Sequence, residues 1–471
     1  MGAAFSKLSG LDRAQSLCDP GTVDVVWHLA NSPLLLVRGQ ISTRPVALAL
    51  LDGHVRGGTV GLEEAAALSD FLRAFLRQSS VSGEASSLIL VLDTGGVRVE
   101  EGPRALAAAS AAGVLLAECT LKGVPTVSVI TGPRGCFGAL SVMAALPDTI
   151  LMVENSHWGL TGPKLFSAVQ AGVTEHQGRA ATSASERLRS GLVDRLVPDD
   201  VEAVRSGLRH SLAALDRVAR PSPIEHVRRA AGWLEERRQL WLSSSGSVAR
   251  HARRRRKLLE YSFRRQWRPT EPIVDAGLLQ SAWGELSGEP ACGIILGPAE
   301  DSYDGIGIIE IAAIVHQLQR TFFLPEGSKA TIVNFVFCQG HVVDLEQERL
   351  GLPRVLAECL RTYVAVRCSG HRVLSVLGGG TYGAAYLALA APSHRIFAIR
   401  GTKVAPMAPA VLRAFHASKG KVSADKLEQE PAEWIPEVVP VESVVRLPRV
   451  LRAAIHATPE PGQRGTVTHA A

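Results

Sequence analysis

The chain has 471 residues, of which 46% are hydrophobic and 20% are charged, and its formal net charge is +6. This length and composition are typical of a globular protein with large cores and two or three domains. No apolar run is long enough to cross a bilayer, so we expect neither a membrane-spanning segment nor a membrane partner.

The seven cysteines are scattered along the chain and form no CxxC pair. This pattern argues for reduced thiols, and against a zinc ribbon or a disulfide framework. The first residues contain no secretory h-region, and their match to the N-myristoylation pattern Met-Gly-x-x-x-Ser is short enough to arise by chance. We therefore expect a cytoplasmic protein.

The first half of the chain alternates apolar runs of strand length with stretches of helical spacing, which predicts an α/β architecture. Residues 1–30 are expected to be irregular, and residues 183–196 are interpreted as a short helix, a break and a short strand. The expected strands are Val46–Leu51, Leu88–Leu92, Val124–Thr131 and Thr149–Val153, and the expected helices are Leu62–Leu76, Ala105–Lys122, Ala139–Leu146, Asp200–Ala219 and Ile224–Leu242.

Two glycine turns follow strands in this half, at Asp93–Arg98 and at Gly132–Gly138. The order strand, glycine turn, helix leaves backbone N–H groups unpaired at a helix N-terminus, where they can bind an anion. Glycine also permits close approach of a ligand and unusual φ values. The turns are interpreted either as an oxyanion site beyond the strand ends or as tight connections, and the pattern alone does not separate the two.

A domain boundary is expected at Ser243–Ser247, because this serine-rich stretch precedes an arginine-rich run, Arg250–Arg268. All charged residues of that run except Glu260 are basic. Such a run can bind nucleic acid, phosphate or an acidic protein, but it is more often a solvated linker. We therefore expect no nucleic-acid partner.

The second half repeats the order of elements seen in the first, although the two halves share little sequence. Its glycine turn, Gly378–Gly383, again lies between a strand and an alanine-rich helix. Two such copies suggest a pseudo-dimer with a cleft between the halves. The expected strands are Cys292–Leu296, Ala330–Val336, Arg372–Leu377 and Arg395–Ile399, and the expected helices are Ile306–Leu318, Leu352–Ser369 and Ala384–Ala391.

Several short motifs of the chain occur in the order found in biotin-independent malonate decarboxylase. The first half resembles the β subunit of that enzyme, and the second half resembles the γ subunit more weakly. The β-like motifs are Leu92–Arg98, Gly132–Gly138, Gly159–Pro163 and Ser190–Asp194, and the γ-like motifs are Gly370–Val373 and Gly378–Gly383.

The resemblance implies a fused β–γ protein of the α/β class, with two tandem crotonase-like (ββα-superhelix) domains that form a pseudo-heterodimer. The β-like domain is expected at residues 1–242, the basic linker at 243–270 and the γ-like domain at 271–471. This fold is akin to that of the acyl-CoA carboxyltransferases.

The resemblance also implies decarboxylation of a malonyl thioester, which leaves an enolate with its negative charge on the thioester oxygen. Two backbone N–H groups can stabilise that charge, and removing one such donor costs about 3 kcal/mol in comparable enzymes. No side-chain nucleophile is needed, in agreement with the lack of a convincing Ser-His-Asp or Cys-His pair. By resemblance, Gly135 and Cys136 are candidates for one oxyanion site, and Gly379, Gly380 and Thr381 for the other.

Other residues near the turns are candidates for substrate contacts. His341 is interpreted as a proton donor to the enolate, a carboxylate ligand or a solvent-facing loop residue, and Tyr382 as a proton donor or a lid. Arg98 and Arg134 are candidates for binding a phosphate of coenzyme A or of a phosphopantetheine arm, or are surface arginines. The remaining substrate-binding candidates are the glycines Gly95, Gly96, Gly138, Gly162 and Gly383.

No histidine has the partner spacing of a metal site, so we expect no metal. No cofactor is expected beyond the phosphopantetheine or coenzyme A that the substrate carries. The chain has no biotin attachment sequence of the Ala-Met-Lys-Met kind, so biotin would have to come on a separate protein. The expected partner is an acyl carrier protein or a coenzyme A thioester, and a homo-oligomer is left open.

Several positions depart from the family pattern, Lys164 and Gly379 among them. Lys164 stands where the β subunit usually carries an acidic residue, and Gly379 stands where the γ subunit carries a lysine. Two alternatives to decarboxylation therefore stay open. One is biotin-dependent carboxyl transfer, and the other is a non-catalytic scaffold that grips an acyl carrier protein through Arg253–Arg256.

Overall fold

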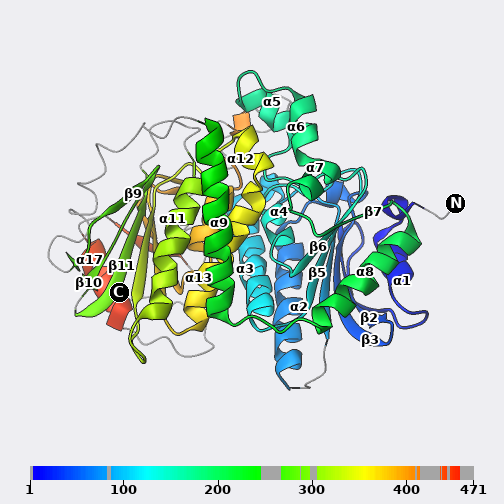
Figure 1. Cartoon of the computed structure of the whole chain (residues 1–471), viewed down its shortest axis with the longest axis horizontal. Helices are drawn as coiled ribbons and strands as arrows, with labels where there is room; N and C mark the ends of the chain where they lie inside the picture. Colours follow the sequence, from blue (N-terminus) through cyan, green and yellow to red (C-terminus); the bar gives the residue numbers. More distant parts are fainter. Residues whose placement is uncertain are drawn as a thin grey trace. The chain divides into compact units, whose positions relative to one another are not determined.

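The computed structural model describes residues 4–81, 86–245, 267–286, 288–297, 305–408, 411–413, 435, 438–442 and 446–456. The chain forms two compact units, whose elements are labelled in Figure 1. Unit 1 comprises Met1–Glu101, Ala108–Ser222 and Val343–Ala357, and unit 2 comprises Gly102–Ala107, Pro223–Val342 and Glu358–Ala471. Most of the arginine-rich run, including Arg253–Arg256, lies outside the described residues.

Unit 1 is built on a seven-stranded sheet whose strands follow the order of the sequence. The first three strands pair antiparallel, and every pair from the third strand to the seventh is parallel. The strands are β1 (Asp24–His28), β2 (Leu34–Ile41), β3 (Arg44–Leu51), β4 (Ser87–Leu92), β5 (Thr126–Ile130), β6 (Thr149–Val153) and β7 (Arg195–Val197).

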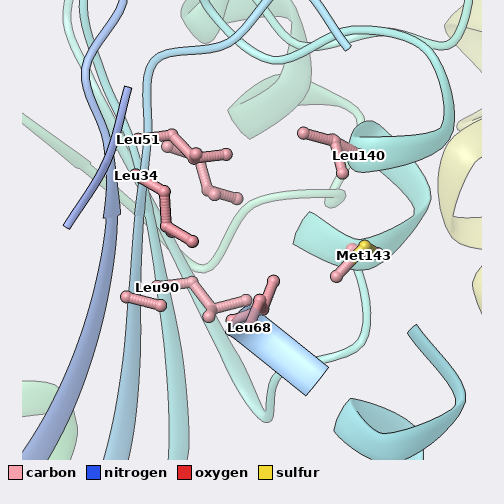
Figure 2. Close-up of a pocket in the computed structure, with 8 residues that line it drawn as sticks. Leu34, Leu51, Leu68, Leu90, Leu140 and Met143 are labelled. Carbon is pink, nitrogen blue, oxygen red and sulfur yellow. The ribbon is translucent and has the colours of Figure 1, made fainter. Parts of the chain in front are cut away.

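Helices cover both faces of this sheet, and its central strands are therefore continuous apolar runs. One face packs against α1 (Gly10–Leu17) and α8 (Val201–Asp216) in a shared apolar core. The other face lies toward α2 (Leu62–Val81) and α4 (Ala139–Ala144), as Figure 2 shows. The remaining helices of this part of the chain are η1 (Phe5–Lys7), η2 (Arg56–Gly58), η3 (Val99–Glu101), α3 (Gly102–Leu121), α5 (Pro163–Val169), α6 (Glu175–Thr182) and α7 (Ala184–Arg189).

One helix corrects an expectation from the sequence. The stretch Val99–Leu121 is long and apolar enough to cross a membrane by length and composition alone, whereas no such run was expected. Most of it is buried in the structure, and the core helices of soluble proteins pass the same test. It is therefore weak evidence for a membrane span.

A segment from the second half of the sequence belongs to unit 1. It contains α12 (Leu345–Arg349), and Leu345 packs in one apolar cluster with Phe166 of α5 and Ala181 of α6. The backbone N–H of Leu345 also donates to the side-chain oxygen of Gln170 at 3.0 Å.

Unit 2 is built on an eight-stranded sheet, in the order β17-β15-β13-β12-β11-β10-β8, with β9 pairing β10. The pairs from β11 to β17 are parallel, and β10 is antiparallel to β11. A separate parallel pair joins β14 to β16. The strands are β8 (Trp267–Pro269), β9 (Val274–Ala276), β10 (Leu279–Leu286), β11 (Glu289–Leu296), β12 (Thr331–Val336), β13 (Arg372–Leu377), β14 (Gly380–Tyr382), β15 (Arg395–Ile399), β16 (Lys403–Ala405) and β17 (Val438–Val441).

An apolar core joins the sheet of unit 2 to α17 (Leu447–His456). The helix after the glycine turn begins as a short α-helix, α14, and continues as a π-helix, η5, where a regular alanine-rich helix was expected. The other helices are α9 (Pro223–Ser245), α11 (Ile308–Gln319), η4 (Arg320–Phe323), α13 (Leu352–Cys368), α14 (Gly383–Ala385) and η5 (Tyr386–Ala390).

The two units repeat one topology, in which an antiparallel strand pair is followed by parallel strands joined through helices. The predicted α/β class, with two units of similar topology, is confirmed. The expectation that residues 1–30 are irregular is wrong, because α1 and β1 lie there. Ser9 starts α1 by accepting the backbone N–H of Asp12 with its side chain.

Candidate functional site

The two predicted glycine turns of unit 1 lie side by side, because they follow the neighbouring parallel strands β4 and β5. The backbone N–H of Thr94 donates to the carbonyl of Gly135 at 2.6 Å, and that of Phe137 donates to the carbonyl of Thr94 at 3.2 Å. Gly96 and Gly138 have φ of +105° and +64°, and a Cβ at Gly96 would stand 3.6 Å from the Cα of Gly138. Both positions therefore need glycine for their φ and for their close approach.

The backbone N–H groups of Gly135 and Cys136, which were expected to bind the oxyanion, each donate to a backbone carbonyl in this structure. The N–H of Gly135 donates to the carbonyl of Gly132 at 3.2 Å, and that of Cys136 donates to the carbonyl of His157 at 2.8 Å. Neither N–H is available to a substrate in this conformation, which corrects the geometry expected for these two residues.

Two other amides of the same turns have no protein acceptor. Among the described residues, no acceptor lies within hydrogen-bond range of the backbone N–H of Val97 or of Ala139. Val97 directly follows Gly96, and Ala139 follows Gly138 as the first residue of α4. Because the two glycines approach each other closely, the residues that follow them carry two unused N–H groups from neighbouring turns, and these are candidates for binding an oxygen anion. Sequence reasoning found these turns but not these amides, because the acceptor of each N–H depends on the tertiary fold.

The buried carboxylate of Asp93 contacts the turn Gly132–Gly138. Asp93 is fully buried, accepts the backbone N–H of Arg134 at 3.1 Å, and forms an ion pair with Arg13 at 3.4 Å. Burial raises the pKa of the Asp93 carboxyl group, and the charge of Arg13 opposes this shift. A Cβ at Gly132 would stand 2.0 Å from Oδ2 of Asp93. The turn is therefore wrapped closely around this carboxylate.

The candidate side chains of unit 1, those of Arg98, Arg134 and Cys136, differ in their partners and their burial. Arg98 forms ion pairs with Glu64 and Glu101, so a phosphate would compete with two carboxylates for its guanidinium. Arg134 has an exposed side chain. Burial raises the pKa of the Cys136 thiol, which argues against a thiolate nucleophile.

The glycine candidates of unit 1 differ in their use of hydrogen bonds. The N–H of Gly95 donates to the carbonyl of Gly57 at 2.9 Å, and that of Gly96 donates to Oγ1 of Thr94 at 3.0 Å. Gly162 precedes α5 and has open space where a Cβ would stand.

Unit 2 contains the same arrangement of backbone. In unit 1 the N–H of Val60 donates to the carbonyl of Gly96 at 3.0 Å, and in unit 2 the N–H of Ile306 donates to the carbonyl of Gly340 at 2.9 Å. This match places His341 of unit 2 at the position of Val97. It also leaves Phe337 at the position of Asp93, since a Cβ at Gly378 would stand 1.9 Å from the Phe337 ring.

The predicted residues of the second turn lie together in unit 2. Gly379 has φ of +62° and open space where a Cβ would stand, whereas Gly383, with φ of +48°, approaches the carbonyl of Pro406. Thr381 is buried and donates from Oγ1 to the carbonyl of Val336 at 3.2 Å. Tyr382 is also buried, with its ring against Gly380.

The imidazole of His341 has a pKa lowered to about 4 by burial. It is therefore neutral at physiological pH, and it can offer a hydrogen bond but not a positive charge. This state argues against a cationic ligand for a carboxylate, and it leaves the imidazole with almost no proton to transfer at neutral pH.

In the part of the chain that the structure describes, no group of three His, Cys, Asp or Glu residues could hold a metal ion. A cavity of about 20 Å³ lies between the sheet of unit 1 and helices α2 and α4, and Figure 2 shows its apolar lining. Its volume is too small for a coenzyme. The lining residues are Leu34, Ala49, Leu51, Leu68, Leu90, Leu92, Leu140 and Met143.

One segment of the chain, which contains both glycine turns of unit 1, is similar to a known protein family. Residues 84–240 match the family model described as acetyl co-enzyme A carboxylase carboxyltransferase-like. This segment is carboxyltransferase-like. It contains both glycine turns of unit 1, and the match covers a third of the chain rather than its whole length.

Curated relatives of the carboxyltransferase-like segment are remote. The acetyl-coenzyme A carboxylase carboxyl transferase subunits beta/alpha of Parafrankia sp. are 28% identical over 191 residues, which are 40% of this chain and 28% of the relative. The malonyl-S-ACP:biotin-protein carboxyltransferase MADC of Malonomonas rubra is 27% identical over 158 residues, 32% of this chain and 47% of the relative. The chain thus spans less than half the length of these two relatives.

Other similarities extend over more of the chain. The biotin-dependent acetyl-/propionyl-coenzyme A carboxylase beta6 subunit of Mycobacterium bovis is 24% identical over 443 residues, which are 89% of this chain and 84% of the relative. The solved structure of a Pseudomonas malonate decarboxylase MdcD-MdcE hetero-dimer is 31% identical, with a TM-score of 0.41, and covers 50% of this chain and 96% of that chain. Because this TM-score is low, the fold assignment rests on the sheet topology described above.

Proposed function

We propose that this protein removes the carboxyl group of a malonyl thioester through an enolate held by backbone amides. The observation that carries the proposal is the contact between Gly96 and Gly138, the residues directly before the unused N–H groups of Val97 and Ala139. The carboxyltransferase-like match of residues 84–240 supports it, because that segment contains both turns.

In this reaction the bond between the α-carbon and the carboxylate breaks, and its electron pair moves into the enolate. The negative charge then lies on the thioester oxygen, and carbon dioxide leaves. The α-carbon finally takes up a proton, which yields the acetyl thioester. Two preorganised N–H donors near that oxygen lower the barrier, and each is worth about 3 kcal/mol in comparable sites.

The substrate carries its own prosthetic group in this proposal. The thioester would be formed with coenzyme A or with the phosphopantetheine arm of an acyl carrier protein, and no further cofactor would be required. The proposal includes the fused β–γ organisation and a cytoplasmic location.

The test is to mix the purified protein with malonyl-acyl carrier protein and with malonyl-CoA, and to follow the loss of carbon dioxide by mass spectrometry. Gly138→Ala should abolish most of the turnover, because the φ of +64° is strained for alanine and any relief of that strain moves the N–H of Ala139, the next residue. Gly172→Ala is the matched control, since Gly172 has φ of +77° and no atom within 4 Å of a Cβ. If the wild type consumes neither malonyl-acyl carrier protein nor malonyl-CoA, the proposal is contradicted.

A second candidate is transfer of the carboxyl group to biotin on a separate protein. Two observations favour it: the similarity to a malonyl-S-ACP:biotin-protein carboxyltransferase, and the repeat of the paired turn in unit 2 at Gly340 and Gly383. Strict dependence of malonyl-thioester consumption on an added biotinyl protein, with formation of carboxybiotin, selects transfer over simple decarboxylation.

A further inference from the structure

A buried ion pair in unit 1 joins helix α7 to helix α12. Nη2 of Arg187 lies 2.8 Å from Oε1 of Glu348, and the two side chains are 0% and 1% exposed. Burying two charges is costly, and a well-packed apolar pair of similar volume is often as stable or more so. Stability alone therefore does not account for this pair, and its hydrogen bonds indicate what it holds.

The ion pair forms hydrogen bonds with the backbone of residues 158–161, which lie beside the glycine turn Gly132–Gly138. The carboxylate of Glu348 accepts the N–H groups of Leu160 at 3.0 Å and of Thr161 at 3.3 Å. Nε of Arg187 donates to the carbonyl of Trp158 at 2.8 Å, and its Nη1 donates to the backbone carbonyl of Glu348 at 2.6 Å. The two side chains thus fix the segment 158–161 at three backbone groups.

The segment 158–161 is hydrogen-bonded to the turn Gly132–Gly138, which contains the candidate oxyanion site. The carbonyl of Leu160 accepts the N–H of Gly138 at 3.2 Å, and the N–H of Gly159 donates to the carbonyl of Cys136 at 3.1 Å. Gly138 directly precedes Ala139, whose N–H is one of the two unused donors. Hydrogen bonds therefore lead from Glu348 through Leu160 to the residue that orients this donor.

We propose that Glu348 and Arg187 are positioning residues, which hold the N–H of Ala139 where the charge of the enolate develops. This inference rests on the proposed function for its catalytic consequence. Neither side chain needs to touch the substrate, because the pair acts through the segment 158–161. The segment that carries Glu348 begins at Val343, two residues after His341 in the sequence.

The test compares Glu348→Gln with Glu346→Gln in the full-length protein. Glu348→Gln keeps the size of the side chain but removes its charge and one of its acceptors, whereas Glu346 forms an exposed ion pair with Arg349 on the same helix. We expect Glu348→Gln to lower kcat by about 100-fold with little change in KM, because a small displacement of a catalytic group costs that much. Hydrogen exchange at residues 138–141 should be about tenfold faster than in the wild type. Glu346→Gln should change neither.

A second variant keeps the test decisive if Glu348→Gln does not fold. The double replacement Arg187→Met with Glu348→Leu leaves no unpaired buried charge, and it should fold while showing the same faster exchange and lower kcat. A folded variant with wild-type exchange at 138–141 overturns the inference, as does a loss of protection spread evenly over unit 1. Exchange needs no turnover, so failure of the wild type to consume any malonyl thioester would contradict the proposed function without deciding this inference.

Discussion

At the residue scale, the conformation of Gly132 is tied to the carboxylate of Asp93. Gly132 has φ of +77° and no room for a Cβ beside Oδ2 of Asp93, whereas Gly21 has φ of +74° and no atom within 4 Å of a Cβ. Both alanine variants carry the backbone strain, but only Gly132→Ala also meets the carboxylate. We expect Gly132→Ala to lower the free energy of unfolding by about 2 kcal/mol more than Gly21→Ala, measured by urea denaturation. Equal losses would show that the close approach has no energetic weight.

His394 makes the stability of the protein depend on pH. Its Nδ1 accepts the backbone N–H of Val373 at 3.1 Å, and burial lowers its pKa to about 4. The folded state therefore resists protonation, so the contribution to stability is complete above the unfolded pKa of about 6.5 and is lost as the pH falls toward 4. We expect this group to reduce the free energy of unfolding by about 2 kcal/mol between pH 7 and pH 5.

The variant His394→Gln should flatten that pH dependence, as measured by urea unfolding at several pH values. The exposed His210 offers the control, because His210→Gln should leave the curve unchanged. A curve for His394→Gln that matches the wild type would remove His394 from the account.

The sequence located the turns of the candidate site but not the groups that act in them. The spacing of Gly132, Gly135 and Gly138 indicates a turn between a strand and a helix, and the structure contains that turn. The use of each N–H depends on neighbours far along the chain, such as the carbonyl of His157 that occupies the amide of Cys136. Such long-range acceptors leave no local signal in the sequence.

At the element scale, helix α8 closes one face of the sheet in unit 1 and begins at a well-defined cap. The side chain of Asp200 accepts the backbone N–H groups of Glu202 at 3.0 Å and Ala203 at 3.1 Å. We expect Asp200→Ala to lower the free energy of unfolding by about 1 kcal/mol, because these N–H groups lose their acceptor. Asp200→Ser should retain most of the stability in urea denaturation, and equal values for the two variants would contradict the role of the cap.

The central parallel strands could be predicted from the sequence, whereas the largely buried strands β2 and β10 and several exposed or irregular elements were missed. The parallel strands β4, β5 and β6 are continuous apolar runs because helices cover both faces, and all three were predicted close to their observed bounds. Strand β1 lies at the sheet edge with largely exposed side chains. Its run Val25-Val26-Trp27 favours a strand but is too short to resemble the buried apolar runs. The π-helix η5 was also missed, since alanine-rich composition indicates a helix but not its hydrogen-bond pattern.

At the scale of the whole molecule, unit 1 is completed by a segment from the second half of the sequence. A fragment of residues 1–242 would contain Arg187 but not Glu348, and would leave a buried charge unpaired. We expect this fragment to be less stable than unit 1 in the full chain by about 3 kcal/mol or more, measured by urea denaturation. Arg187→Met should restore part of the loss, and a fragment as stable as the full chain would argue against this dependence.

The central claim is that the N–H groups of Val97 and Ala139 hold the charge of the enolate. The most direct measurement is nuclear magnetic resonance of the protein labelled with ¹⁵N at valine and alanine, with an analogue of the malonyl thioester in which a nitro group replaces the carboxylate. The account predicts a downfield shift of both amide protons on binding, and loss of the Ala139 shift in Gly138→Ala. Binding of the analogue with both resonances unchanged would contradict it.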